Sequence, residues 1–268
     1  MMKYEAGFIG AGNMGGALAS AAARQATGEQ VAVACSSPAR SAAAAERLGC
    51  QAAAPEEILS SSKFVFLGVK PQMIDGVVQS LAAPIAASES IFVSMLAGVQ
   101  LERLTRLLGA DKKIIRILPN TACAVGKGVV LYCANGNVTE ADLATFRSLM
   151  ADAGIVDPIS EGLIDAGCAI TGCGPAFAYM FIEALADGGV ACGLPRAKAQ
   201  EYAAQMVLGS AKLVLESGKH PGELKDAVCS PGGSTIQGVR VLEEHGLRGA
   251  VMDAVIASYN KTKEMGKG

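Results

Sequence analysis

Residues 4–15 read YEAGFIGAGNMG, an apolar run that leads directly into three spaced glycines. The run predicts a buried strand, and the Ala-rich residues 16–25 predict a helix behind the glycines. Gly10, Gly12 and Gly15 fit the pattern G-x-G-x-x-G: the first permits a tight turn, the second lets a pyrophosphate approach, and the third lets the helix pack close to the strand. The alternative is a glycine turn that only packs tightly. We predict a dinucleotide-binding loop made of Gly10, Ala11, Gly12, Asn13, Met14 and Gly15.

The composition is that of a soluble enzyme with a large apolar core. The chain has 268 residues, of which 51% are hydrophobic and 18% charged, and its net charge is −2. This length suits one large domain or two ordinary ones. No basic stripe supports binding to nucleic acid or to an anionic membrane. No signal peptide or membrane span is recognisable, so we expect a cytoplasmic protein.

The cysteine and histidine content gives no framework for a metal site. Eight cysteines occur without a C-x-x-C pair, and there are only two histidines. A zinc site or a thioredoxin motif is therefore not expected. We expect reduced cysteines that act as small hydrophobic residues. The alternative is a reactive thiol at Cys173 or Cys229, both beside Gly-rich stretches.

The end of the second predicted strand, VAVAC at 31–35, indicates which nicotinamide cofactor binds. Enzymes that use NAD usually have an acidic residue there to bond the ribose 2′-hydroxyl, but this chain has no acid before Glu46. Ser36, Ser37 and Arg40 suit a 2′-phosphate better, so we predict NADPH, with NADH as the alternative. A serine that caps the next helix, with a solvated Arg40, would explain the same residues.

Further apolar runs predict a doubly wound parallel sheet, an α/β fold in which ligands bind at the carboxyl ends of the strands. The loops after three of these runs would surround the nicotinamide. Lys70 could be catalytic, but a strand-end lysine that bonds backbone or ribose is the preferred interpretation. The predicted strands are 64–69, 91–95, 113–118, 128–133 and 155–159, and the predicted loop residues are Val69, Lys70, Pro71, Ala97, Gly98 and Asn120.

The second half of the chain is predicted to be helical. Residues 170–195 predict a helix that starts through Gly-Cys-Gly-Pro and ends near Gly188, and residues 195–218 predict a long amphipathic helix. Three shorter helices follow. Because so many apolar residues fall on these helices, we expect part of this half to be buried against a partner chain; a monomeric helical cap is the alternative. The predicted domains are residues 1–160 and 161–268.

A second glycine loop, SPGGST at 230–235, lies between two of these helices. Its free N–H groups would form a small anion-binding nest. Because the loop contains no arginine, a single carboxylate fits better than a phosphate. Helix capping alone would explain Ser234 but not two consecutive glycines. We predict a carboxylate site made of Ser230, Gly232, Gly233, Ser234 and Thr235.

The positions of the two histidines limit which class of reaction this chain can catalyse. A dehydrogenase of 2-hydroxy acids needs a general base, usually His, and neither His220 nor His245 falls in a predicted site. A protonated imine is already an electrophile, so hydride can reduce it without a protein acid, and orientation supplies much of the catalysis. Reduction of a small imino acid is the predicted chemistry.

Three stretches resemble the pyrroline-5-carboxylate reductase family. The most specific is HPGELKDAVCSPGGSTIQGVRVLEE at 220–244; ITGCGPAFAYMFIEALADGGVACGLPR at 170–196 and FIGAGNMGGAL at 8–18 support it. The resemblance covers essentially the whole chain. It implies an N-terminal Rossmann domain, an all-α C-terminal dimerisation domain, and NAD(P)H-dependent reduction of (S)-1-pyrroline-5-carboxylate to L-proline.

The same resemblance implies roles for particular residues. Ser230 and the Gly233–Thr235 backbone would bind the substrate carboxylate, and the catalytic Thr235 hydroxyl would bond the ring nitrogen. It also implies active sites at the interface of a homodimer, and decamers in some members. One departure is visible: Cys173 and Phe177 stand where the family often has hydroxyl-bearing residues, which puts any polar contact there in doubt.

Two other functions share parts of this pattern. A β-hydroxyacid dehydrogenase would also have an all-α second domain, but it needs a catalytic lysine, and residues 168–177 and 229–236 contain none. A non-enzymatic NADP-binding regulator would keep the first glycine loop and have no use for the second.

Overall fold

The structure is a computed structural model, and it describes residues 2–265. The described chain forms two compact units. The first extends to Gly172 and takes in the chain from Tyr259 onward; the second is Cys173–Ser258. The boundary predicted after residue 160 lies ahead of helix α8 (Ile164–Thr171), which belongs to the first unit.

An eight-stranded sheet forms the centre of the first unit, with the order β3-β2-β1-β4-β5-β6-β7-β8. The predicted Rossmann-type α/β fold is confirmed, with two differences. The short strand β3 was not predicted, and β7 runs antiparallel to β6 although an all-parallel sheet was expected. The strands are β1 Tyr4–Ile9, β2 Val31–Ala34, β3 Gln51–Ala52, β4 Ser62–Leu67, β5 Ile91–Ser94, β6 Lys113–Pro119, β7 Gly128–Ala134 and β8 Gly154–Pro158.

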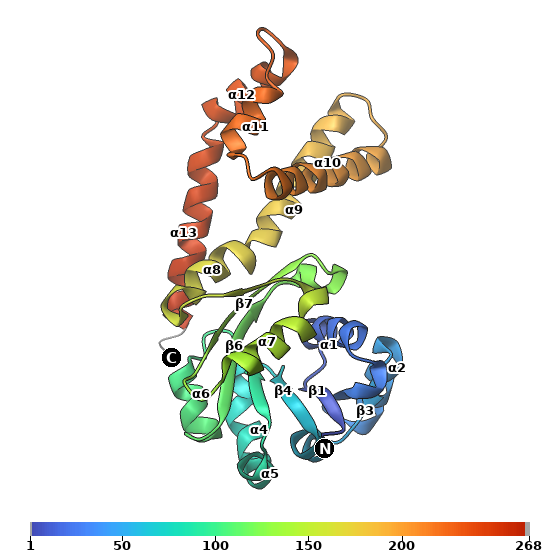
Figure 1. Ribbon diagram of the computed structural model, residues 1–268. Coiled ribbons are helices and arrows are strands. Elements are labelled where there is room, and N and C mark those ends of the chain that lie inside the picture. Colours follow the sequence, from blue (N-terminus) through green and yellow to red (C-terminus); the bar gives the residue numbers. More distant parts are fainter. Residues whose placement is uncertain (1, 266–268) are drawn as a thin grey trace. The chain divides into compact units, whose positions relative to one another are not determined.

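Alternate residues of the strands fill two hydrophobic cores, one on each face of the sheet. Figure 1 shows the sheet with its flanking helices. Phe8 and Phe66 stack with their ring centroids 4.3 Å apart on the face that α1, α2 and α7 cover. Ile9 and Leu67 point to the other face, which α3 to α6 cover. The sheet is therefore buried on both sides, as a doubly wound fold requires. The helices are α1 Asn13–Gln25, α2 Pro38–Leu48, α3 Pro55–Ser61, α4 Ile74–Ser80, α5 Ala82–Ala87, α6 Leu101–Leu108, α7 Glu140–Leu149 and α8 Ile164–Thr171, with 3-10 helices η1 Gly28–Gln30, η2 Pro71–Met73, η3 Thr121–Val125, η4 Ala151–Ala153 and η5 Glu161–Leu163.

The second unit is made of helices. Its hydrophobic core is small, because the buried apolar residues that cluster there are Ala186, Ala199 and Ala203. The predicted end of the first helix near Gly188 was wrong, because α9 continues to Ala191. Gly189 inside this helix allows close packing, since a Cβ there would lie 3.3 Å from the Ala199 methyl. The helices are α9 Gly174–Ala191, α10 Arg196–Ser217, α11 Pro221–Ala227, α12 Ser234–Glu244 and α13 Leu247–Met265, whose last residues belong to the first unit.

Much of the apolar surface of these helices is exposed. Met180 on α9 is 69% exposed and Leu215 on α10 is 73% exposed. The stretch Glu161–Ala191 is long and apolar enough to cross a membrane by length and composition, and 6% of its most apolar window is buried. That stretch is interrupted by a turn at 172–173. Exposed apolar surface on this scale marks an interaction site, as the predicted partner chain requires.

Candidate functional site

The glycine loop after β1 has the backbone that its sequence predicts. Gly10 has a φ of +103°, which L side chains rarely adopt, and a Cβ there would lie 2.6 Å from the backbone of Gly68. A Cβ at Gly15 would lie 2.1 Å from the carbonyl oxygen of Gly10, so α1 packs directly on the turn. A Cβ at Gly12 would meet no atom within 4 Å. The first and third glycines thus shape the loop, and the second leaves open space where a phosphate can approach.

Helix α1 presents its N-terminus to that space. Gly12 is the N-cap and offers no side chain to the first N–H groups, and the first turn carries no acidic residue. Asn13 is exposed, whereas Ala11 is buried beneath the loop. The unsatisfied N–H groups and the helix dipole favour an anion at this position, so the residues present fit a pyrophosphate.

The residues that follow β2 fit both interpretations of this segment, a helix cap and a site for a 2′-phosphate. Ser37 is the N-cap of α2 and accepts a hydrogen bond from the Arg40 backbone N–H at 3.3 Å. The Arg40 guanidinium donates to the Ser36 hydroxyl at 3.2 Å. Both side chains are exposed, so a positive charge and a hydroxyl lie together beside the strand end and remain accessible. These groups fit a 2′-phosphate.

The remaining predicted cofactor residues lie at one edge of the sheet. Strands β1, β4, β5 and β6 are parallel neighbours, so their carboxyl ends meet there. Lys70 is exposed, and no hydrogen bond or ion pair joins its ammonium to another described residue. At the same edge are Val69, Pro71, Ala97, Gly98 and Asn120.

Asn120 differs from the other residues of this edge, because its carboxamide is engaged within the protein. It accepts from the Val129 N–H at 3.1 Å and donates to the Thr171 carbonyl at 2.9 Å. Gly68 was not predicted as part of the loop although it lies against Gly10. A glycine directly after a buried strand is the sequence signal that could have identified it.

The second glycine loop lies in the second unit, ahead of α12. Gly232 has a φ of +70°, and a Cβ at Gly233 would lie 2.4 Å from the Ser230 hydroxyl oxygen. The Gly233 N–H closes the turn by donating to the Ser230 carbonyl at 3.0 Å. The two consecutive glycines are therefore both required by the turn.

The structure contradicts the alternative interpretation, in which Ser234 only caps α12. The N-cap is Gly233, Ser234 is the first helical residue, and no side chain caps this helix. The hydroxyls of Ser230, Ser234 and Thr235 make no hydrogen bond to other described residues. Free N–H groups and free hydroxyls thus lie together at an exposed helix N-terminus, an arrangement that suits a single carboxylate.

Both histidines have local structural roles. The His220 Nδ1 accepts from the Gly222 N–H at 3.0 Å and caps α11. The His245 ring lies 2.9 Å from the Val241 carbonyl at the end of α12. Cys173 and Phe177 stand where the family often has hydroxyl-bearing residues, and this difference leaves the start of α9 intact. The helix begins at Gly174 with Pro175 in its first turn.

Burial keeps several thiols protonated. It raises the pKa of Cys50 and that of Cys133 to about 11 each, and it also raises the pKa of Cys123. A thiol with so high a pKa is a poor nucleophile at neutral pH. These three residues therefore behave as the small hydrophobic residues that the sequence predicted.

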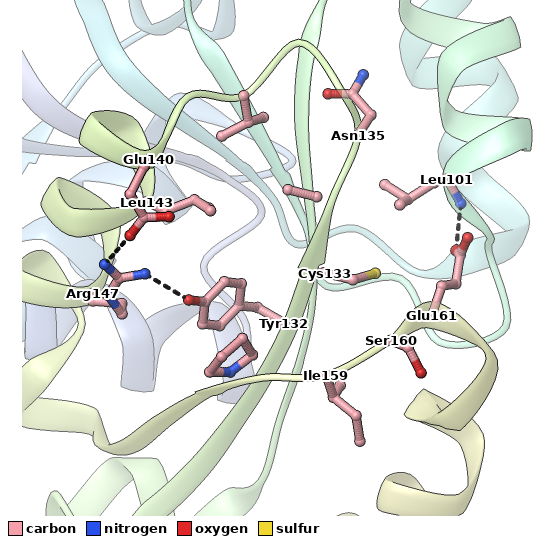
Figure 2. Close-up of a pocket in the computed structure, with 13 residues that line it drawn as sticks. Leu101, Tyr132, Cys133, Asn135, Glu140, Leu143, Arg147, Ile159, Ser160 and Glu161 are labelled. Atoms are coloured by element: carbon pink, nitrogen blue, oxygen red, sulfur yellow. Dashed lines mark hydrogen bonds and ion pairs between the residues drawn. The ribbon is translucent and has the colours of Figure 1, made fainter.

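A pocket of about 710 Å³ lies along β7 in the first unit (Figure 2), and none of the predicted site residues lines it. The charged groups drawn there are already paired: Arg147 donates to the Tyr132 hydroxyl at 2.9 Å, and Glu161 accepts from the Leu101 N–H at 2.7 Å (Figure 2). Glu161 also pairs with Arg116, which is 2% exposed. This buried ion pair was not predicted, and it joins β6 to the segment that leads into α8.

Known proteins resemble this chain over both units. Residues 161–265 match the family described as pyrroline-5-carboxylate reductase dimerisation, and residues 5–98 match the one described as NADP oxidoreductase coenzyme F420-dependent. The pyrroline-5-carboxylate reductase of Escherichia coli (strain K12) is 42% identical over 269 residues, which cover 99% of this chain and 100% of that protein. That of Pisum sativum is 40% identical over 266 residues, which cover 98% and 96%.

A solved structure agrees with these relatives. The crystal structure of Plasmodium falciparum pyrroline carboxylate reductase with NADP bound has a TM-score of 0.86 and 32% sequence identity. The match covers 99% of this chain and 100% of that one. The similarity in sequence thus extends to the backbone of the whole chain.

Proposed function

This chain belongs to the pyrroline-5-carboxylate reductase family, and from that premise we propose that its second glycine loop binds the carboxylate of the substrate. The reaction is the NAD(P)H-dependent reduction of pyrroline-5-carboxylate to proline. The observation that carries the loop assignment is the N-terminus of α12, where an uncapped helix end and three free hydroxyls face solvent.

NADPH is the cofactor, and it supplies hydride when bound. We assign its pyrophosphate to residues 10–15, because the space at Gly12 and the N–H groups of α1 suit two phosphates. Ser36, Ser37 and Arg40 are assigned to the 2′-phosphate. The loops at the carboxyl ends of β4, β5 and β6 are assigned to the nicotinamide end.

We assign the positioning of the substrate to the loop ahead of α12. The backbone N–H groups of residues 233–235 and the Ser230 hydroxyl would hold the carboxylate, and Gly232 and Ser234 complete the turn. The Thr235 hydroxyl would bond the ring nitrogen. Because both histidines are engaged in capping contacts, this assignment has no protein general acid, and orientation of a protonated imine carries the catalysis.

The chain forms a dimer through its helical region. A second copy would cover the exposed apolar residues of α9 and α10, which explains why a stretch long enough to span a membrane is exposed. Assembly of dimers into a decamer and a cytoplasmic location remain predictions. The mass of the protein in solution tests the first, and cell fractionation tests the second.

The test is oxidation of NADPH on addition of DL-pyrroline-5-carboxylate, followed by absorbance, beside NADH at the same concentration. Fast turnover that prefers NADPH supports both the reduction and the 2′-phosphate site. Turnover that prefers NADH would keep the reduction and contradict the assignment of Ser36, Ser37 and Arg40. If the chain binds cofactor but reduces no pyrroline-5-carboxylate, the proposed function is contradicted. The alternative of a non-enzymatic NADP-binding regulator would then be favoured.

A further inference from the structure

The Glu161 carboxylate holds the start of a helix that is distant in sequence. Its Oε1 accepts from the Leu101 backbone N–H at 2.7 Å, and Figure 2 draws this bond. Leu101 is the first residue of α6, and Gln100, the N-cap of that helix, makes no side-chain cap bond. The first N–H groups of a helix have no partner within it. Glu161 therefore caps α6 from a segment 60 residues further along the chain.

Glu161 is itself fixed to the sheet. The same Oε1 accepts from the Arg116 guanidinium at 3.0 Å. Arg116 is buried on β6, where it lies beside Ser94 of β5, and Asp165 approaches its guanidinium at 3.6 Å. A buried charge is stable only when it is paired and hydrogen-bonded. The carboxylate that caps α6 is thus held in place by the protein alone.

The helix start that Glu161 holds is also the end of a short loop, residues 95–100, which leads out of β5. Leu96 and Val99 anchor this loop, because both are buried in the core on the α6 side of the sheet. The Val99 N–H donates to the Leu96 carbonyl at 3.3 Å and closes a turn. Between them lie the exposed Ala97 and Gly98, whose φ is +75°. The loop tip is therefore supported by β5 on one side and by the start of α6 on the other.

We propose that Glu161 is a positioning residue for the nicotinamide: by holding the Leu101 N–H, it keeps the tip at Ala97 and Gly98 in the shape that receives the ring. The inference rests on the proposed function, because it takes these two residues to lie at the nicotinamide end of the cofactor site. A site that is ordered in advance loses less entropy on binding. Without the bond from Leu101, the cofactor has to order the loop itself, and its apparent affinity falls accordingly.

Adenosine 2′,5′-bisphosphate separates this role from a purely structural one. It carries the adenine and the 2′-phosphate of NADPH and lacks the nicotinamide. Loss of the Glu161 carboxylate should weaken the binding of NADPH and leave the binding of the bisphosphate unchanged. A general loosening of the first unit would weaken both.

Asp165→Ala is the matched control for Glu161→Ala. Both substitutions take a carboxylate from the same Arg116 guanidinium. Only Glu161→Ala also removes the acceptor of the Leu101 N–H. The difference between the two variants therefore isolates the cap of α6 from the pairing of Arg116.

The measurements are made on the full-length protein, with both dissociation constants taken from calorimetric titration. For E161A we expect an NADPH Kd about tenfold above that of the parent and a bisphosphate Kd within about twofold. Hydride transfer in a single turnover at saturating NADPH should also slow by about 10- to 100-fold, because a misplacement of about 1 Å can cost that much in rate. D165A is expected to keep both constants and the rate of the parent.

Leu101→Pro replaces E161A if that variant fails to fold. Proline removes the donor of the bond and leaves Glu161 paired with Arg116. It suits the first position of a helix, and Gln100, with a ψ of 160°, suits the residue before a proline. L101P is expected to show the same difference between NADPH and the bisphosphate.

Three outcomes would overturn the proposal. They are an unchanged NADPH Kd in the variant that loses the bond, equal losses of affinity for NADPH and the bisphosphate, and an equal rise of the NADPH Kd in D165A. A parent protein that does not reduce pyrroline-5-carboxylate would instead contradict the proposed function. The two failures are distinguishable, because the titrations need no turnover.

Discussion

Gly15 lies so close to Gly10 that a Cβ at Gly15 would stand 2.1 Å from the Gly10 carbonyl oxygen, whereas a Cβ at Gly12 would meet nothing within 4 Å. Gly15→Ala should therefore push α1 away from the turn and lower the free energy of unfolding by about 1–3 kcal/mol. Gly12→Ala should change that free energy by less than about 1 kcal/mol and weaken NADPH binding at least about tenfold. Urea denaturation and a cofactor titration measure the two effects. Equal losses of stability in the two variants would contradict the separate roles of these glycines.

Arg40→Gln tests the 2′-phosphate site. A charge-assisted hydrogen bond contributes about 1.5–3 kcal/mol, so we expect the NADPH Kd to rise about tenfold and the NADH Kd to stay constant. Arg47→Gln is the matched control, since it removes the same charge from the last turn of the same helix. A parallel rise for both cofactors in R40Q would mean that Arg40 acts on something other than the 2′-phosphate.

Thr235→Ala tests the substrate loop. Loss of one hydrogen bond to the ring nitrogen should lower kcat/KM for pyrroline-5-carboxylate about tenfold and leave NADPH binding nearly intact. Thr145→Ala removes a hydroxyl that bonds only the Ala141 carbonyl on α7, so it should leave turnover unchanged. If T235A lost NADPH affinity and turnover equally, the loop would be misplaced.

Asp142 should make the fold sensitive to acid. Burial by itself would raise the pKa of Asp142, but hydrogen bonds from the Lys113 ammonium and from Thr139 lower it to about 2. Because the folded pKa lies below the unfolded value of about 3.9, the stabilisation is present above about pH 4 and is lost as the pH falls toward 2.

The substitution Asp142→Asn removes that charge. It should lower the free energy of unfolding by about 1–2 kcal/mol near neutral pH, and this penalty should shrink as the pH falls toward 2, where about half of the parent carboxyl is protonated. Denaturation curves at the two pH values, at one protein concentration, decide this. A penalty that does not change with pH would point to packing and not to charge.

Met180→Glu tests which surface forms the dimer. Burial of a methionine side chain contributes about 1.5–3 kcal/mol, so a charge there should raise the dimer dissociation constant at least about tenfold. Met73→Glu is the control, because Met73 is also an exposed methionine, 52% accessible, but lies in the first unit. Sedimentation velocity over a dilution series gives both constants. An unaffected M180E dimer would move the interface away from this part of α9.

The sequence was most informative where local sterics decide the backbone. The roles of Gly10 and Gly15 follow from a turn and a close packing that involve neighbouring residues, so G-x-G-x-x-G was sufficient to predict them. The antiparallel β7 was missed because strand periodicity carries no direction. The connection from β6 to β7 is too short for a parallel crossover, which needs about a dozen residues, and that length was the signal.

The misassignments in the second half have a different cause. Helix α8 was not predicted, because the first helix of this half was expected to start only at the Gly-Cys-Gly-Pro stretch. Serine is a good N-cap by residue type, but the N-cap of α12 is Gly233 and not Ser234. A side chain at position 233 would collide with Ser230. Asn120 was assigned to the cofactor edge from its place after a strand; its bond to Thr171 joins residues far apart in sequence, which no local pattern reports.

The three alanines Ala186, Ala199 and Ala203 are a very small core for the five helices of the second unit. So little internal burial cannot offset the conformational entropy that those helices lose on folding. The missing free energy has to come from association, which makes the thermal stability of this enzyme a function of how much of it is present. Dilution of the protein below the dissociation constant of the dimer would then unfold the helices, because loss of the partner and loss of the helical fold are coupled.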